Sequence, residues 1–183
     1  TACDIAGPFY VKRARGTVKR YALVFSCSVT RGVHIEILHT LDASSFIDGF
    51  RRFVARRGPV KTMRSDNAPG ILLAEKQMAA AVEEWNNSVA SEFHQKGVEW
   101  IHPAPYSSSK MGEVESMIAV IRRAWFHVEK GQVISDEGLL TVAAEVEAMV
   151  NGHPLTLASD DPSDPVPLTP SHFLTFKGGS GVA

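Results

Sequence analysis

The sequence predicts an α/β fold in which a five-stranded mixed sheet is flanked by helices. Strand-like runs fill residues 2–41 with only short turns between them, which is typical of an antiparallel meander. A helix-periodic segment at residues 42–57 then precedes a short fourth strand. A helix between two strands favours a parallel crossover. The second half of the chain adds two strongly amphipathic helices, which can cover the sheet.

Three strands are expected at the start of the chain. Residues 2–11 and 20–30 are rich in β-branched and aromatic side chains, the residue types that favour strands. Residues 12–18 lie between them and are predicted to form a basic turn, because they contain a glycine and several cationic side chains. Residues 33–41 alternate between apolar and polar side chains and form the third strand. Short connections make these neighbours antiparallel.

A helix is expected next, with Asp42 or Ser44 as its N-cap and Gly58-Pro59 as its end. Residues 60–65 then form a strand parallel to the first, and residues 98–102 form the fifth strand. The helix carries apolar residues at spacings of one, three and four, which gives it one buried face; they are Phe46, Ile47, Phe50, Phe53 and Val54.

Helices dominate the remaining sequence. Residues 113–130 carry the strongest helical pattern, and residues 136–150 carry a second one. Residues 74–85 and 88–97 are expected to form shorter helices, and the proline-rich residues 151–170 are expected to be extended. Strands followed by a helix, a strand and further helices is the order of the ribonuclease-H-like fold.

The chain has 183 residues, the size of one domain. Residues 1–176 are expected to form the core domain, and the glycine-rich residues 177–183 a flexible C-terminal tail. No apolar run is long enough to span a membrane. Cys3 and Cys27 lie in strand-like runs and are expected to be buried thiols in a reducing compartment.

Charge is distributed unevenly along the chain, although the net charge is only −1. Residues 1–64 contain 12 Lys and Arg against 4 Asp and Glu, whereas residues 65–183 contain 7 against 16. Two basic clusters, at residues 12–20 and 51–61, account for this imbalance. They are consistent either with a face that binds nucleic acid or with hairpin turns and helix surfaces that are solvated.

Three acidic residues lie where local structure would hold a carboxylate in place. Asp4 lies in the first predicted strand, Asp66 follows the fourth, and Glu115 lies in the first turn of the helix at residues 113–130. Carboxylates from two strands and one helix can converge, and hard cations such as Mg²⁺ prefer oxygen ligands. The simpler interpretation is that these are surface charges, since the chain has 20 acidic residues.

Five short motifs occur in order along the chain: Asp4-Ile5-Ala6-Gly7-Pro8-Phe9, Ser65-Asp66-Asn67, Glu99-Trp100-Ile101-His102-Pro103, His153-Pro154-Leu155-Thr156 and Pro167-Leu168-Thr169-Pro170-Ser171-His172-Phe173-Leu174. Taken together, they resemble the catalytic core of retroelement integrases, a DDE-type family of the ribonuclease-H-like superfamily. The last two motifs and the 48 residues between Asp66 and Glu115 are similar to the BEL/Pao retrotransposon branch. The resemblance spans about residues 1–176.

The resemblance implies a metal-dependent polynucleotidyl transferase that catalyses DNA 3′ processing and strand transfer. Asp4, Asp66 and Glu115 would hold two Mg²⁺ or Mn²⁺ ions, with Asp4 as the bridging ligand. It also implies that the partners are element ends and target DNA, that the cores form at least a dimer, and that the protein acts in the nucleus after entry in a cytoplasmic pre-integration particle. Lys110, Arg122 and Arg123 are the candidate DNA contacts.

The sequence departs from the family pattern in two loops, at residues 68–71 and 107–112. Glu113 also lies two residues from Glu115, which is preferred because the apolar residues after it then fall in the family register. Two other functions therefore remain open. One is a domesticated core that binds DNA or protein without strand transfer, and the other is a nuclease of the same fold that only hydrolyses DNA.

Overall fold

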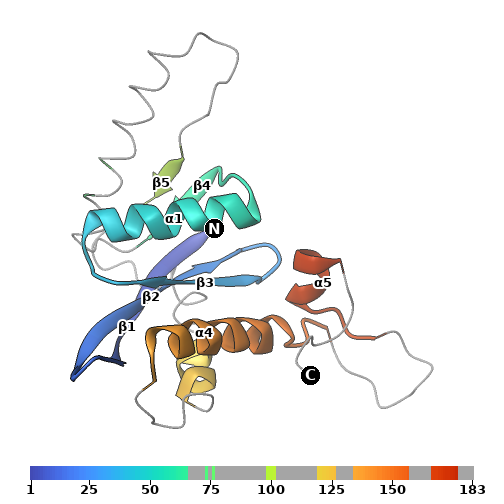
Figure 1. Ribbon diagram of the computed structural model, residues 1–183. Helices are drawn as coiled ribbons and strands as arrows, with labels where there is room; N and C mark the ends of the chain where they lie inside the picture. The colour runs from blue at the N-terminus through green and yellow to red at the C-terminus, as the bar shows by residue number, and fades with distance from the viewer. Residues whose placement is uncertain are drawn as a thin grey trace.

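A mixed five-stranded sheet with the strand order β3-β2-β1-β4-β5 organises the protein (Figure 1). The computed structural model describes residues 1–65, 73, 76, 98–101, 119–126, 134–156 and 166–176. The first three strands are antiparallel, whereas β4 runs parallel to β1 and β5 parallel to β4. The strands are β1 (Ala2–Arg13), β2 (Gly16–Ser26), β3 (Val33–Leu38), β4 (Thr62–Arg64) and β5 (Glu99–Ile101).

The β1–β2 hairpin is longer than the sequence predicted. Residues 12–18 do not form a turn: the strands stay paired as far as Arg13 and Gly16, and only Ala14 and Arg15 connect them. The physical reason is tertiary, because Val11 is fully buried against the core and Val18 packs beside it. Extended pairing therefore continues where the local sequence alone favours a turn.

A β-bulge interrupts this hairpin. Ala6 pairs with Ala22 and Phe9 pairs with Arg20, so Gly7 and Pro8 together lie opposite Tyr21. Gly7 has a φ of +123°, a region that L side chains rarely adopt. The extra residue reverses which side chains face each side of the sheet. Even-numbered residues of β1 face one side before the bulge and the other side after it.

Helix α1 (Ala43–Arg57) covers one face of the sheet (Figure 1). Asp42 caps it, with Oδ1 accepting the backbone N–H of Ser45 at 2.8 Å, and Gly58 ends it, as the sequence predicted. Its apolar stripe is buried against β2, β3 and β4, and the rings of Phe53 and Phe25 stack with centroids 3.9 Å apart. This layer forms one of two hydrophobic clusters in the described protein.

Helix α4 (Asp136–Asn151) and the helical residues 119–126 cover the opposite face (Figure 1). Ser135 caps α4 through a hydrogen bond from the N–H of Gly138 at 3.1 Å. Leu139, Val146 and Trp125 bury against the sheet and form the second hydrophobic cluster. The predicted helix at 136–150 is confirmed, and the part of the predicted 113–130 helix that the structure describes is helical.

The short helix α5 (Pro170–Thr175) was not predicted, since its sequence was expected to be extended up to residue 170 and unassigned beyond it. Thr169 caps it, and its N–H donates to Nδ1 of His172 at 3.0 Å. The expected helices at 74–85 and 88–97 and the tail at 177–183 lie outside the described residues, apart from Lys76, which is helical.

Two further sequence expectations concern the cysteines and membranes. Cys3 is buried as predicted, but Cys27 is partly exposed because it follows β2, at the start of a turn. Both are free cysteines.

Within the described part of the chain, no helix is long and apolar enough to cross a membrane.

Candidate active site

Asp4 lies on β1, the central strand of the sheet, opposite Val24 of β2. Its side chain is half-buried, and its Oδ1 accepts the backbone N–H of Ile5 at 2.6 Å. Strand pairing on both sides fixes the backbone that carries this carboxylate. The structure therefore places this carboxylate on the central strand of the sheet, and its role as a metal ligand stays a prediction.

Strand β4 approaches this position from the other side. Ala2 of β1 pairs with Arg64 of β4 in parallel, and the Arg64 N–H donates to the carbonyl of Thr1 at 2.9 Å. Ser65, the next residue, is fully buried. Asp66, Lys110 and Glu115 lie outside the described residues, so their assignment stays a prediction. Among the residues that the structure describes, no three His, Cys, Asp or Glu side chains are grouped to hold a metal ion.

Arg122 and Arg123 lie on the exposed side of the helical residues 119–126. The opposite side of this segment is buried through Ile121 and Trp125. Arg123 donates from Nε to the carbonyl of Ala119 at 3.3 Å, which keeps its guanidinium on the helix surface. Both arginines are thus accessible to a partner, and their proposed contact with DNA stays a prediction.

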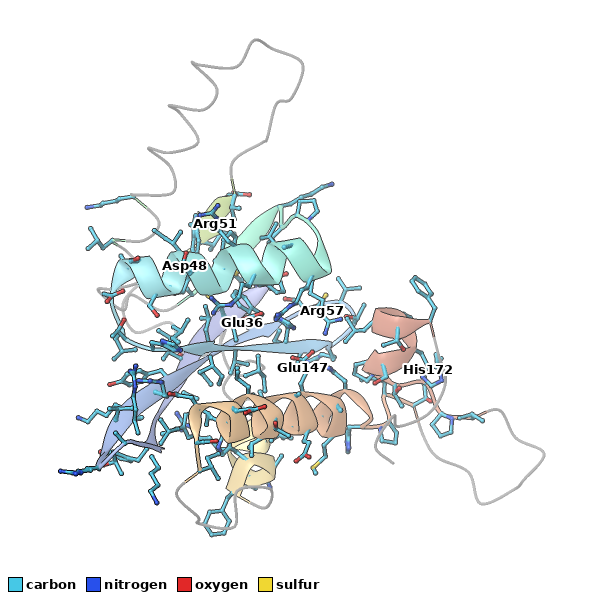
Figure 2. All side chains as sticks on the ribbon, viewed as in Figure 1. Glu36, Asp48, Arg51, Arg57, Glu147 and His172 are labelled. Atoms are coloured by element: carbon cyan, nitrogen blue, oxygen red, sulfur yellow. The ribbon has the colours of Figure 1, made fainter. Side chains whose placement is uncertain are left out.

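A second polar site, which sequence reasoning missed, lies between α1 and α4 along the free edge of β3 (Figure 2). Glu36 of β3 is buried and accepts hydrogen bonds from Arg52 Nε at 2.6 Å and from Nη1 of Arg56. Nε2 of His34 lies 2.8 Å from Oε1 of the same carboxylate. This network connects an edge strand to the exposed side of α1.

Glu147, on helix α4, joins the network from the side opposite α1. It accepts a hydrogen bond from Arg57 and lies 3.3 Å from Nδ1 of His34. Figure 2 shows Glu36, Arg57 and Glu147 in the space between the two helices. The three arginines of this network are therefore not simply solvated, and Arg20, from the other basic cluster, is buried in an ion pair with Asp136. At these four positions the basic side chains form ion pairs within the protein, which neither of the two interpretations of the basic clusters anticipated.

The network shifts the pKa values of His34, Glu36 and Glu147. Burial opposes ionisation of all three, but contacts with opposite charges outweigh it. Hydrogen bonds and charges from Glu147 and Glu36 raise the pKa of His34. Those of His34 and the nearby arginines lower the pKa of Glu36, and the pKa of Glu147 is lowered in the same way. His34 is therefore stabilised as an imidazolium between two carboxylates.

Side chains also form hydrogen bonds with the backbone N–H and C=O groups at the free edge of β3. Asn151 accepts the N–H of Val33 at 2.8 Å and donates to its carbonyl at 2.9 Å. Glu147 accepts the N–H of Ile35 at 2.9 Å, and Arg52 donates to the carbonyl of Ile37 at 3.0 Å. Unpaired edge groups attract foreign strands, so these side chains protect the edge. A groove of about 1270 Å³ remains above them, between α1, α4 and α5.

One local signal could have identified this site. His34 and Glu36 are two residues apart in an otherwise apolar strand, so both point to the same side of it. Two polar side chains on one buried face need partners. The arginines at positions 52 and 56 are one helical turn apart, but only the fold shows that they meet Glu36.

Comparison with known proteins identifies the fold. No family model matches the sequence, and no curated protein matches it. A chain of the simian T-cell lymphotropic virus intasome in complex with PP2A regulatory subunit B56 gamma is similar over 95% of this chain, with 14% identity and a TM-score of 0.61. This chain covers 53% of that one, about half of its length.

Two structures of the HTLV-2 integrase catalytic core domain with magnesium are also similar. The dimeric form has 12% identity and a TM-score of 0.57, and the trimeric form has 13% identity and a TM-score of 0.56. Each covers 87% of this chain, which in turn covers 89% and 87% of the two cores respectively. At this identity the likeness concerns the fold. The protein has the ribonuclease-H-like fold of retroviral integrase catalytic cores.

Proposed function

We propose that this chain is the catalytic core of a retrotransposon-type integrase, a metal-dependent polynucleotidyl transferase that performs DNA 3′ processing and strand transfer. The observation that supports it most is the placement of Asp4 on the central strand beside β4. Ala2 and Arg64 are paired across a separation of 62 positions, and the same separation lies between Asp4 and Asp66. This register favours two carboxylates at one point of a fold shared with integrase cores.

The donor set fits Mg²⁺ or Mn²⁺. Asp4 presents a half-buried carboxylate on a fixed backbone, and oxygen donors are what these ions prefer. Asp4, Asp66 and Glu115 would hold the ions, which supply charge stabilisation at the phosphoryl oxygens and activation of the attacking oxygen. Asp4 would orient the site through its hydrogen bond with Ile5. Water or a DNA 3′ hydroxyl is the nucleophile, so no protein nucleophile is required.

The comparisons support the partners that accompany this function. The HTLV-2 cores are described as dimeric and trimeric and in complex with magnesium, and the simian virus chain belongs to an intasome. We propose by analogy that this core forms at least a dimer and acts on element ends and target DNA. Membership of the BEL/Pao branch and action in the nucleus, after a cytoplasmic pre-integration particle, are parts of the same proposal.

The most direct test is reversal of strand transfer on a branched DNA substrate, with the 183-residue chain and Mn²⁺. The wild-type chain is expected to give the joined product, and Asp4→Asn is expected to abolish it. Asp48→Asn is the matched control, because Asp48 is an exposed aspartate on α1. If Asp4→Asn reacts as well as Asp48→Asn, the assignment of Asp4 is wrong.

The same assay separates the two other functions. A nuclease of this fold would shorten the branched substrate without joining its strands. A domesticated binding module would retain the DNA and give no product at all. In either of these outcomes the transferase proposal fails, while the fold assignment is unaffected.

A further inference from the structure

The outer half of the β1–β2 hairpin is a two-stranded ribbon. Residues 9–13 and 16–20 pair with each other, while β3 pairs only with Tyr21–Ser26 and β4 pairs with β1 only at Ala2. Among the described residues no further strand joins this part of the hairpin, although Ile134 forms an isolated parallel bridge with Val11. Figure 1 shows its tip extending past the end of β3. We call residues 9–20 the ribbon arm.

One side of the ribbon arm is fixed to the body of the protein. The ring of Phe9 stacks on Trp125 with centroids 4.2 Å apart, and Val11 is fully buried. The N–H of Lys12 donates to the carbonyl of Ile134 at 2.8 Å. Arg20 forms a two-bond ion pair with Asp136, at 2.6 and 3.0 Å. The arm is therefore held rigidly in its extended position.

The other side of the arm is exposed and cationic. Tyr10 pairs with Lys19 across the strands, and Lys12 pairs with Thr17, so the two lysines are diagonal neighbours on one side. We call this side the lysine face. Arg13 and Arg15 add two exposed charges at the tip, where nitrogen-ended side chains project in Figure 2. All four exposed residues of the lysine face lie on the α1 side of the sheet: Tyr10, Lys12, Thr17 and Lys19.

No carboxylate neutralises this face within the described part of the protein. The sequence contains no Asp or Glu between Asp4 and Glu36. Asp136 is engaged by Arg20 and also lies near Arg13, on the opposite side of the arm. No described residue forms an ion pair with Lys12, Arg15 or Lys19. The positive charges of Lys12 and Lys19 are therefore available to an anionic partner.

We propose that the ribbon arm binds the phosphate backbone of duplex DNA through its lysine face. Only the lysine face is available to a partner, because the opposite side of the arm packs against the body of the protein. Lys and Tyr are both common phosphate donors. The rigid attachment means that little conformational entropy is lost on binding. An unligated hairpin tip with solvated lysines is the simpler alternative, and it predicts no loss of binding when the lysines are removed.

This surface is distinct from the proposed metal site. Lys12 is eight positions from Asp4 along β1, which is about 26 Å in an extended strand. The bulge also places the lysine face on the α1 side, whereas Asp4 shares the α4 side with its partner Val24. The arm would therefore hold DNA away from the reacting phosphate. It goes beyond the proposed transferase activity, because it requires no metal.

Duplex binding by fluorescence anisotropy in EDTA tests the proposal. Lys12→Ala/Lys19→Ala is expected to weaken binding roughly eightfold per lost contact near 0.1 M salt and to lower the salt slope by about two. Arg51→Ala/Lys61→Ala removes the same charge from exposed residues of the other basic cluster and should change binding little. Lys12→Arg/Lys19→Arg should retain binding, and unchanged melting temperatures confirm that the variants fold.

Two results would overturn the proposal. The first is equal weakening by both double-alanine variants, since net charge alone would then account for the effect. The second is unchanged DNA binding together with lost binding to vesicles containing phosphatidylserine, which would assign the arm to anionic membranes. Because EDTA removes the metal ions, neither result depends on whether the transferase site is active.

Discussion

Replacing Glu36 with glutamine removes the charge at the centre of the network between α1 and α4. The side chain of Glu36 is 5% exposed, and it contacts Arg52, Arg56 and His34. Glutamine keeps the shape but leaves these cations without their shared counter-charge. We expect Glu36→Gln to lower the stability of the fold.

The size of the effect follows from the exposure of the partners. Removing one member of a buried ion pair typically costs about 3–5 kcal/mol. The side chains of Arg52 and Arg56 are 42% and 60% exposed, so water can solvate both after the change. We therefore reduce the loss to about 2–3 kcal/mol. For a protein of this size the melting temperature should fall by roughly 4–12 °C.

Scanning calorimetry at neutral pH measures this change. Arg56→Ala is the matched control, since it removes a contact to the same carboxylate from an exposed side chain. It should cost about 1 kcal/mol or less. If Glu36→Gln lowers the melting temperature no more than Arg56→Ala does, the carboxylate is not a buried charge on which the fold depends.

Three further changes have defined outcomes. The raised pKa of His34 contributes stability that is complete below its ordinary value of 6.5 and is lost as the pH rises through the folded value. The free energy of unfolding in urea should therefore differ less between about pH 5.5 and 9 in His34→Gln than in the wild type. Gly7→Ala should lower the free energy of unfolding by about 1–3 kcal/mol, because φ at Gly7 is +123° and a Cβ would lie 3.1 Å from the Arg20 carbonyl oxygen. Gly16→Ala is the control: open space surrounds Gly16, so this variant should have the melting temperature of the wild type. Arg122→Ala/Arg123→Ala should weaken binding to all DNA sequences alike and reduce the salt slope by about two; sequence-dependent weakening would contradict phosphate contact.

The lowered pKa values of Glu36 and Glu147 make the stability of the fold decrease at low pH. Their contribution is complete above the ordinary value of 4.5 and is lost as the pH falls through the folded values. Together with His34, they place the greatest stability of the network between these two ordinary values.

The sequence by itself determined the local elements and their order. Strand-favouring residue types and the alternation at residues 33–41 identified the first three strands, and apolar residues three and four positions apart identified α1 and α4. Asp42 and Gly58 marked the ends of α1, because caps act on the nearest backbone groups. The local pattern also placed Asp4 in the first strand, and the sheet order shows that this strand is central. A resemblance carried by short motifs predicted the integrase-like fold, which the comparisons confirm.

Only the tertiary structure decided which distant residues meet. His34 and Glu147 are 113 positions apart, and Arg20 and Asp136 are 116 apart, so no local period connects them. The length of the β1–β2 hairpin was decided in the same way, because Val11 is buried by a helix layer far along the chain. Hydrogen bonds and ion pairs act between atoms that are close in space, whatever their separation in the sequence. Folding therefore brings together charged residues that are far apart along the chain.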